Sequence, residues 1–230
     1  MLTLFLFSLF MFLIYYFLPQ ITYYICVYVK FLLPVKNVEI VKSTFIFKNI
    51  YLLSFPGKFP SMYFSKMLAI FSFLSIIVIP SLKIIPKNFS IWIALASFIM
   101  LVSALFFVFF SYRFPYTLTD FSELYVKTEI AIWWVLTPFV ISFFTVPLPE
   151  RVLPKVFVVM AILGYGIIFG TVRYFVFLYV LWKFSYIFMA PLFFIFGPLA
   201  DFLYIVGIYS FYLSHLAIKL SRKKEVWIWA

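Results

Sequence analysis

The sequence predicts an all-α, polytopic membrane protein with about six transmembrane helices. Of its 230 residues, 67% are hydrophobic and 11% are charged, and the mean hydropathy is +1.17. A water-soluble fold with this composition would expose apolar surface on nearly every face. Long apolar runs also recur along the chain, with short segments containing proline, lysine or arginine between them. These observations identify an integral membrane protein.

Six apolar runs have roughly the length needed to cross about 30 Å of hydrocarbon. They are residues 2–33, 67–79, 90–112, 130–146, 156–181 and 202–218. Pro19 and Gln20 interrupt the first run, which predicts either one kinked helix or two shorter elements. The second run is too short to cross alone, so the span is expected to include the residues just before it. Lys66 would then extend its side chain to the membrane interface.

The segments between the runs predict three further features. Residues 37–60 are rich in β-branched and aromatic residues, which predicts one or two extended strands in a membrane-facing loop after the first span. Residues 113–129 form a polar loop before the fourth run. Residues 184–200 carry Pro191, Gly197 and Pro198, which favours a re-entrant or interfacial half-helix before the last span. With no internal repeat or linker in the sequence, 1–230 is expected to form a single integral membrane domain.

The charge distribution indicates lipid as a partner and gives an orientation. The formal net charge is +11, but the cations are scattered between apolar runs, so anionic headgroups are the expected partner and nucleic acid is not. The amino terminus lacks a basic segment and a cleavage motif, which favours a retained signal anchor. The basic tail and the loops around 82–87 and 149–155 share one side if there are six crossings. Both termini are therefore expected to be cytoplasmic, in a prokaryotic cytoplasmic membrane.

No metal or cofactor is expected. The chain has one cysteine, Cys26, and one histidine, His215, which excludes an internal disulfide and any site rich in cysteine or histidine. Cys26 is predicted to be a buried, inert thiol. Asp201, Tyr204, Ile208, Tyr212 and His215 share a helical stripe, which is more typical of a packing face than of a site.

Arg173 is the candidate functional residue, because it lies inside the apolar run 156–181. A charge at that depth costs at least a few kcal/mol. Gly166 and Gly170 form a small-xxx-small pair that permits close helix approach, and Arg173 follows on the same face. The spacing predicts that Arg173 points into the helix bundle.

Helical rise places other ionisable residues at the same depth. At about 1.5 Å per residue, Arg173 lies roughly 27 Å above the basic loop at Lys155, and Asp201 and Glu129 reach a similar level from their own ends. Lys127 lies just outside that level. We expect these four residues to form an outward-facing pocket in which Arg173 binds an anionic carboxylate or phosphate. The alternative is that the acidic residues are interfacial and Arg173 pairs with one of them for folding alone.

Residues 126–155, followed by "GIIFGTVRYF" at 166–175, resemble the middle section of the exosortase and archaeosortase family. These proteins are polytopic membrane transpeptidases that process sorting signals of exported proteins. The resemblance implies that Arg173 occupies the position of the family's arginine. The family's nucleophilic cysteine is expected between Lys127 and Glu129, where this chain has none, which implies a non-catalytic or degenerate member.

The leading hypothesis is therefore an exosortase-like core that engages an exported or lipid-linked anionic substrate at the outer face without covalent catalysis. A structural or assembly subunit of a larger membrane complex is an alternative, and it predicts a partner membrane protein. A small transporter and an enzyme that uses Cys26 are further alternatives. If the protein is an enzyme, a membrane-embedded peptidase or transpeptidase is the expected class.

Overall fold

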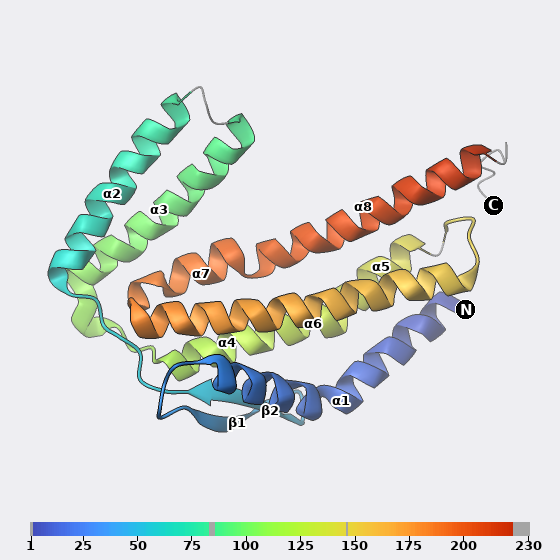
Figure 1. Ribbon diagram of the computed structural model, residues 1–230, viewed down its shortest axis with the longest axis horizontal. Coiled ribbons are helices and arrows are strands. Elements are labelled where there is room, and N and C mark those ends of the chain that lie inside the picture. The colour runs from blue at the N-terminus through green and yellow to red at the C-terminus, as the bar shows by residue number, and fades with distance from the viewer. Residues whose placement is uncertain (1, 83–85, 146, 223–230) are drawn as a thin grey trace.

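The computed structural model describes residues 2–82, 86–145 and 147–222 (Figure 1), and most of them are helical. The α-helices are α1 (Leu2–Leu32), α2 (Met62–Ser81), α3 (Lys87–Phe110), α4 (Leu118–Ala131), α5 (Thr137–Thr145), α6 (Val152–Lys183), α7 (Met189–Phe196) and α8 (Pro198–Arg222). Two strands, β1 (Glu39–Phe45) and β2 (Lys48–Ser54), follow α1. Short 3-10 turns occur at η1 (Ser111–Arg113) and η3 (Tyr186–Phe188). The helical class and the extended segment after the first helix are confirmed.

Within the described residues, five helical stretches are long and apolar enough to cross a membrane. They are Ser8–Leu32, Met62–Ser81, Lys87–Arg113, Val152–Lys183 and Tyr186–Ser221. Large apolar side chains remain exposed along all five, as contact with lipid requires. The predicted fourth run, 130–146, is not among them. A π-helical turn, η2 (Ile132–Leu136), lies in this segment between α4 and the nine-residue α5.

The helices run back and forth along the long axis of the molecule. Figure 1 shows α1, α4 with α5, α6, and α7 with α8 lying alongside one another, while the α2–α3 hairpin diverges from α7 and α8. The start of α1 and the end of α8 lie at the same end of the bundle. At that end, Lys219 Nζ lies 2.5 Å from Glu150 Oε1, which ties the segment between α5 and α6 to α8.

Helix α1 is one bent helix and not two elements. Pro19 lies inside it, and the helix changes direction in its middle (Figure 1). A proline removes one backbone donor from the helix, and three residues later the Thr22 hydroxyl donates to the carbonyl of Leu18 at 2.9 Å, a bond that also favours bending of a helix. The bend separates the first part of α1 from the part that the strands cover.

The two strands form an antiparallel hairpin packed on α1 and α4. Phe45 pairs with Lys48, so the connection is a two-residue turn. Three side chains of β2 enter the core, where Ile50, Leu52 and Leu53 are fully buried. Backbone N–H groups of β2 donate to side chains outside the sheet, from Tyr51 to Thr22 Oγ1 and from Leu53 to the Tyr174 hydroxyl. The hairpin is therefore fixed to both α1 and α6.

Helix α7 is a short helix before the last span, where a re-entrant or interfacial half-helix was predicted, and it is not re-entrant. It continues in the same general direction into α8 (Figure 1) and does not turn back. The break between the two helices is at Gly197, where a Cβ would lie 2.1 Å from the carbonyl oxygen of Phe193. Only glycine fits there, and Pro198 next to it supplies no backbone donor.

Candidate functional site

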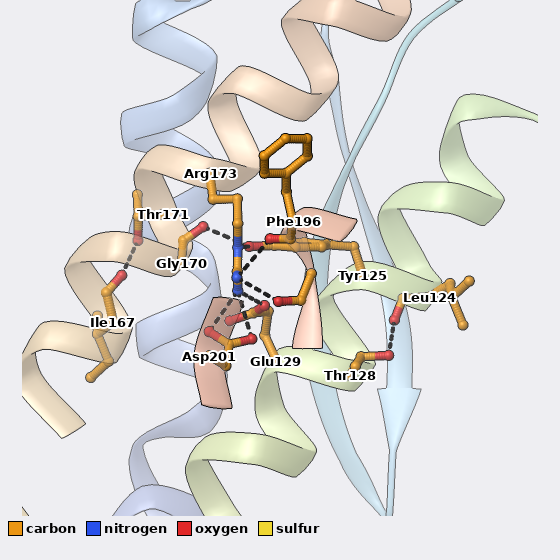
Figure 2. A network of polar contacts seen from close by, with 11 residues as sticks. Leu124, Tyr125, Thr128, Glu129, Ile167, Gly170, Thr171, Arg173, Phe196 and Asp201 are labelled. Carbon is orange, nitrogen blue, oxygen red and sulfur yellow. Dashed lines mark hydrogen bonds and ion pairs between the residues drawn. The ribbon is translucent and has the colours of Figure 1, made fainter. Parts of the chain in front are cut away.

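Arg173 is buried in the bundle between two carboxylates from other helices. The residue is 5% exposed, and its Nη2 lies 2.8 Å from both carboxylate oxygens of Asp201 in α8. Nη2 also donates to Glu129 Oε1 in α4. Glu129 and Asp201 are buried as deeply as the arginine. The predicted convergence of these two acidic residues on Arg173 is confirmed (Figure 2).

The remaining N–H groups of Arg173 bind a tyrosine and the break between α7 and α8. Nη1 donates to the carbonyl oxygens of Phe196 and Gly197, both at 2.9 Å. Nε donates to the hydroxyl of Tyr125 at 2.9 Å, and this hydroxyl in turn donates to the Gly170 carbonyl at 2.9 Å. A helix break leaves carbonyls without intrahelical donors, so the guanidinium caps the carboxyl end of α7.

These contacts engage the whole guanidinium. Arginine has five N–H donors. Nε has one acceptor, Nη1 has two, and Nη2 has two carboxylates. The guanidinium carbon also lies 5.5 Å and 5.3 Å from the ring centres of Tyr125 and Phe169. An anionic ligand would reach Arg173 only by displacing one of these groups.

The predicted glycines make room for the cluster. A Cβ on Gly170 would lie 2.9 Å from Glu129 Oε2, and a Cβ on Gly166 would lie 2.6 Å from the Tyr204 hydroxyl. Real Cβ atoms do not come this close to another heavy atom. The glycine face of α6 therefore accommodates the acidic and aromatic side chains that surround Arg173.

Lys127 is not part of this cluster. Its Nζ lies 2.5 Å from Glu123 Oε1, one helical turn away on α4, and its side chain is 36% exposed. Glu123 also accepts a hydrogen bond from Ser43 of β1 at 2.8 Å. The lysine hydrogen bond, and secondarily the serine, lower the pKa of the Glu123 carboxyl. Lys127 thus belongs to the contact between α4 and the hairpin.

Sequence reasoning missed Tyr125 and the two carbonyls. Tyr125 lies four residues before Glu129 and so shares its helical face, which was a usable signal. The carbonyls of Phe196 and Gly197 were signalled only indirectly, by the Gly-Pro pair that interrupts the helix. Cys26 is buried, as expected, and His215 is exposed near the end of α8.

One side of the cluster is not fully hydrogen-bonded. Among the described side chains, Glu129 Oε2, Trp133 Nε1 and the Tyr204 hydroxyl are buried without a hydrogen-bond partner. Glu129 and Trp133 also line a cavity of about 20 Å³, which is enough for about one water molecule. The cluster therefore presents an acceptor at Glu129 and no spare arginine donor. No group of three or more histidine, cysteine or acidic side chains in the described ranges is placed to hold a metal ion.

A large groove lies beside the cluster, between α3, the start of α4, and the η3–α7 segment. Its volume is about 690 Å³. Aromatic and aliphatic side chains make up most of its lining, which comprises Val102, Ser103, Phe106, Phe107, Phe114, Pro115, Tyr116, Asp120, Phe121, Leu124, Tyr186, Ile187, Met189, Ala190, Phe193 and Phe194. Its one acidic lining residue, Asp120, caps α4 by accepting from the backbone N–H and hydroxyl of Thr117, both at 2.7 Å. The α7 wall of the groove belongs to the helix whose end Arg173 caps.

Comparison of the chain with known protein families, curated proteins and solved structures found no match.

Proposed function

We propose that this protein binds the hydrocarbon chain of a lipid or lipid-linked molecule in the groove between α3 and α7. The observation that carries the proposal is the groove itself, whose volume of about 690 Å³ lies within the usual range of roughly 300–1,000 Å³ for small-molecule sites. An almost wholly apolar groove of this size favours a long, flexible, apolar ligand over a polar one.

The position of the groove supports a lipid as its ligand. One wall comes from α3 and the other from α7, and both belong to stretches apolar enough to cross a membrane. The ends of α3 and α6 and the start of α4 lie at the end of the bundle away from the chain termini (Figure 1). A hydrocarbon chain in the adjoining leaflet reaches such a groove without passing through water.

The headgroup of the ligand is proposed to be anionic. Arg113 immediately precedes Phe114, Pro115 and Tyr116 at the rim, and it is exposed. Its guanidinium carbon lies 5.4 Å from the ring centre of Tyr112, a stacking arrangement that holds the cation at the rim. A phosphate or carboxylate at that position would pair with Arg113.

In this proposal, Arg173 is a positioning residue and not an anion ligand. Its donors bind Glu129, Asp201 and the end of α7, so it fixes the wall of the groove. No covalent step is proposed. The resemblance to exosortases and archaeosortases stays a prediction, because no match bears on it.

The proposed topology has six crossings, with the end of α4, η2 and α5 together forming the fourth. The alternating direction of the helices and the common end shared by both chain termini support it (Figure 1). The basic residues around 149–155 lie at that same end, so the positive-inside rule makes it cytoplasmic. The groove and the hairpin would then face the outer side of a prokaryotic cytoplasmic membrane.

The test is lipid retention by a protein whose groove is filled. Ala190→Trp adds bulk inside the groove, and Ala161→Trp adds the same bulk at an exposed position of α6. After exhaustive detergent exchange, native mass spectrometry should find bound lipid on the wild type and Ala161→Trp, and much less on Ala190→Trp. Equal lipid on all three proteins would contradict the proposal.

A scaffold subunit is a second candidate, favoured by the α2–α3 hairpin. This hairpin diverges from α8 (Figure 1) and exposes Phe71, Phe73 and Leu74 along α2. A partner helix that packs on this face would co-purify with the protein. That partner would be lost on polar substitution of α2 and retained in Ala190→Trp.

A further inference from the structure

The turn of the β-hairpin consists of two apolar residues in an unusual backbone conformation. Ile46 and Phe47 have φ angles of 41° and 64°. Turns of this kind are normally made by asparagine, aspartate and glycine, because β-branched and bulky residues are strained at positive φ. Phe47 is 98% exposed and Ile46 is 53% exposed. In water, this turn would be unfavourable for two reasons: its backbone is strained, and its apolar side chains are exposed to solvent.

The surroundings of the turn are those of a membrane interface. The hydroxyl of Tyr15 in α1 donates to the Ile46 carbonyl at 3.2 Å, and Lys48 Nζ lies 5.1 Å from the centre of the Tyr15 ring. Phe12 and Tyr16 are exposed nearby on α1. Aromatic residues with lysine among them are typical of the boundary between hydrocarbon and headgroups.

The length of α1 places this boundary close to the turn. The part of α1 before Pro19, residues 2–18, rises about 26 Å, which is close to the roughly 30 Å of bilayer hydrocarbon. In this proposal, the apolar stretch Ser8–Leu32 therefore extends past the hydrocarbon on the hairpin side. Beyond Pro19, α1 is covered by the hairpin, where Tyr51 donates to Thr22. Tyr15 lies four residues before Pro19, so the turn reaches about 6 Å past that proline, toward the membrane.

The turn suits that region better than the strands do, because one of its backbone groups already has a donor inside the protein. A two-stranded hairpin has free edges, which hydrocarbon does not tolerate. At the turn, however, the Ile46 carbonyl has the Tyr15 hydroxyl as its donor and does not depend on water. The charged residues begin directly behind it, at Lys48, whose long side chain can return to the headgroups.

We propose that Ile46 and Phe47 insert into the leaflet on the hairpin side and anchor the hairpin to the lipid surface. The bilayer interface takes up the exposed phenyl ring and so offsets the strained turn. Lys42 and Lys48 then face the lipid phosphates. The proposal requires only that α1 crosses a bilayer, and it is independent of the groove.

The experiment measures the depth of a fluorescent label. Phe47→Cys on a Cys26→Ala background is labelled with an environment-sensitive fluorophore and reconstituted in nanodiscs of phosphatidylcholine and phosphatidylglycerol. Glu39→Cys is the matched control, because Glu39 is exposed at the opposite end of the hairpin, about 20 Å away. The label at 47 should show blue-shifted emission and quenching by lipids brominated near the headgroup end. The label at 39 should show neither.

A second label position guards against a local folding defect. Ile46→Cys, labelled in the same way, should reproduce the shift and the quenching, and circular dichroism checks the fold of each variant. Water-like emission at both 46 and 47 overturns the proposal. A failure of Ala190→Trp to release lipid would leave these label readings unchanged, so the two proposals fail separately.

Discussion

Replacing Arg173 by methionine should destabilise the protein strongly. The substitution keeps the length of the apolar stem and removes the guanidinium. Glu129 and Asp201 then remain buried without a cation, and the carbonyls of Phe196 and Gly197 lose their donor. The end of α7 is released at the same time.

The magnitude follows from these contacts. Removing one partner of a buried ion pair costs about 3–5 kcal/mol. The two carbonyls that lose their donor make this a lower bound, because an unsatisfied buried group costs about 1–3 kcal/mol. For a chain of this size, a loss of about 3–5 kcal/mol lowers Tm by roughly 6–20 °C. The triple variant Arg173→Met, Glu129→Gln, Asp201→Asn should recover much of this loss, because no buried charge is left uncompensated.

The assay is thermal unfolding in nanodiscs, with Arg151→Met as the matched control. Arg151 is an exposed arginine that makes no side-chain cap to α6, and its replacement should change stability by less than about 0.5 kcal/mol. Arg173→Lys should fall between the wild type and Arg173→Met, since lysine has three donors and no planar fork. A stability of Arg173→Met within about 0.5 kcal/mol of the wild type would show that the buried ion pairs do not hold the bundle together.

Three further predictions concern the surroundings of the cluster. Gly170→Ala should destabilise the protein by about 1–3 kcal/mol, because the new Cβ would overlap the cluster. Gly164→Ala has open space around it and should stabilise the protein by about 0.5–1 kcal/mol. Equal effects of the two variants in chemical denaturation would contradict this. Tyr174→Phe should lose about 1–3 kcal/mol, because a buried N–H of β2 loses its acceptor, and an unchanged unfolding midpoint would show that this bond contributes nothing. The hydrogen bond from Lys127 lowers the pKa of Glu123 below its ordinary value of 4.5. The stability of the wild type relative to Glu123→Gln should therefore be constant above pH 4.5 and shrink as the pH falls below it. A stability difference that grows on acidification would show that the pKa of Glu123 is raised instead.

Much of the cluster was predictable because helices have a fixed rise. Counting from the basic loops placed Arg173, Glu129 and Asp201 at one level, and the glycine face of α6 gave the direction of the arginine. Lys127 was predicted less well, since a residue two positions from Glu129 points to a different side of the helix. It pairs within its own helix instead.

Other features depended on tertiary structure that no local pattern encodes. The turn at Ile46 and Phe47 carries none of the residues that mark a hairpin turn, so only the extended character of 37–60 was visible. The groove arises where α3 meets α7, residues about 90 positions apart in sequence, and no periodicity reports such a meeting. The division of the fourth run by a π-helical turn was hidden for the same reason, because its residues are as apolar as those of a regular span.

An electron cryo-microscopy map of the protein in lipid nanodiscs would test lipid binding and the Arg173 cluster together. We expect elongated density for a hydrocarbon chain between α3 and α7, beside an α7 whose carboxyl end contacts the Arg173 guanidinium. A map in which side chains of α3 and α7 close the groove completely, or in which Arg173 faces lipid away from Glu129 and Asp201, would contradict this expectation.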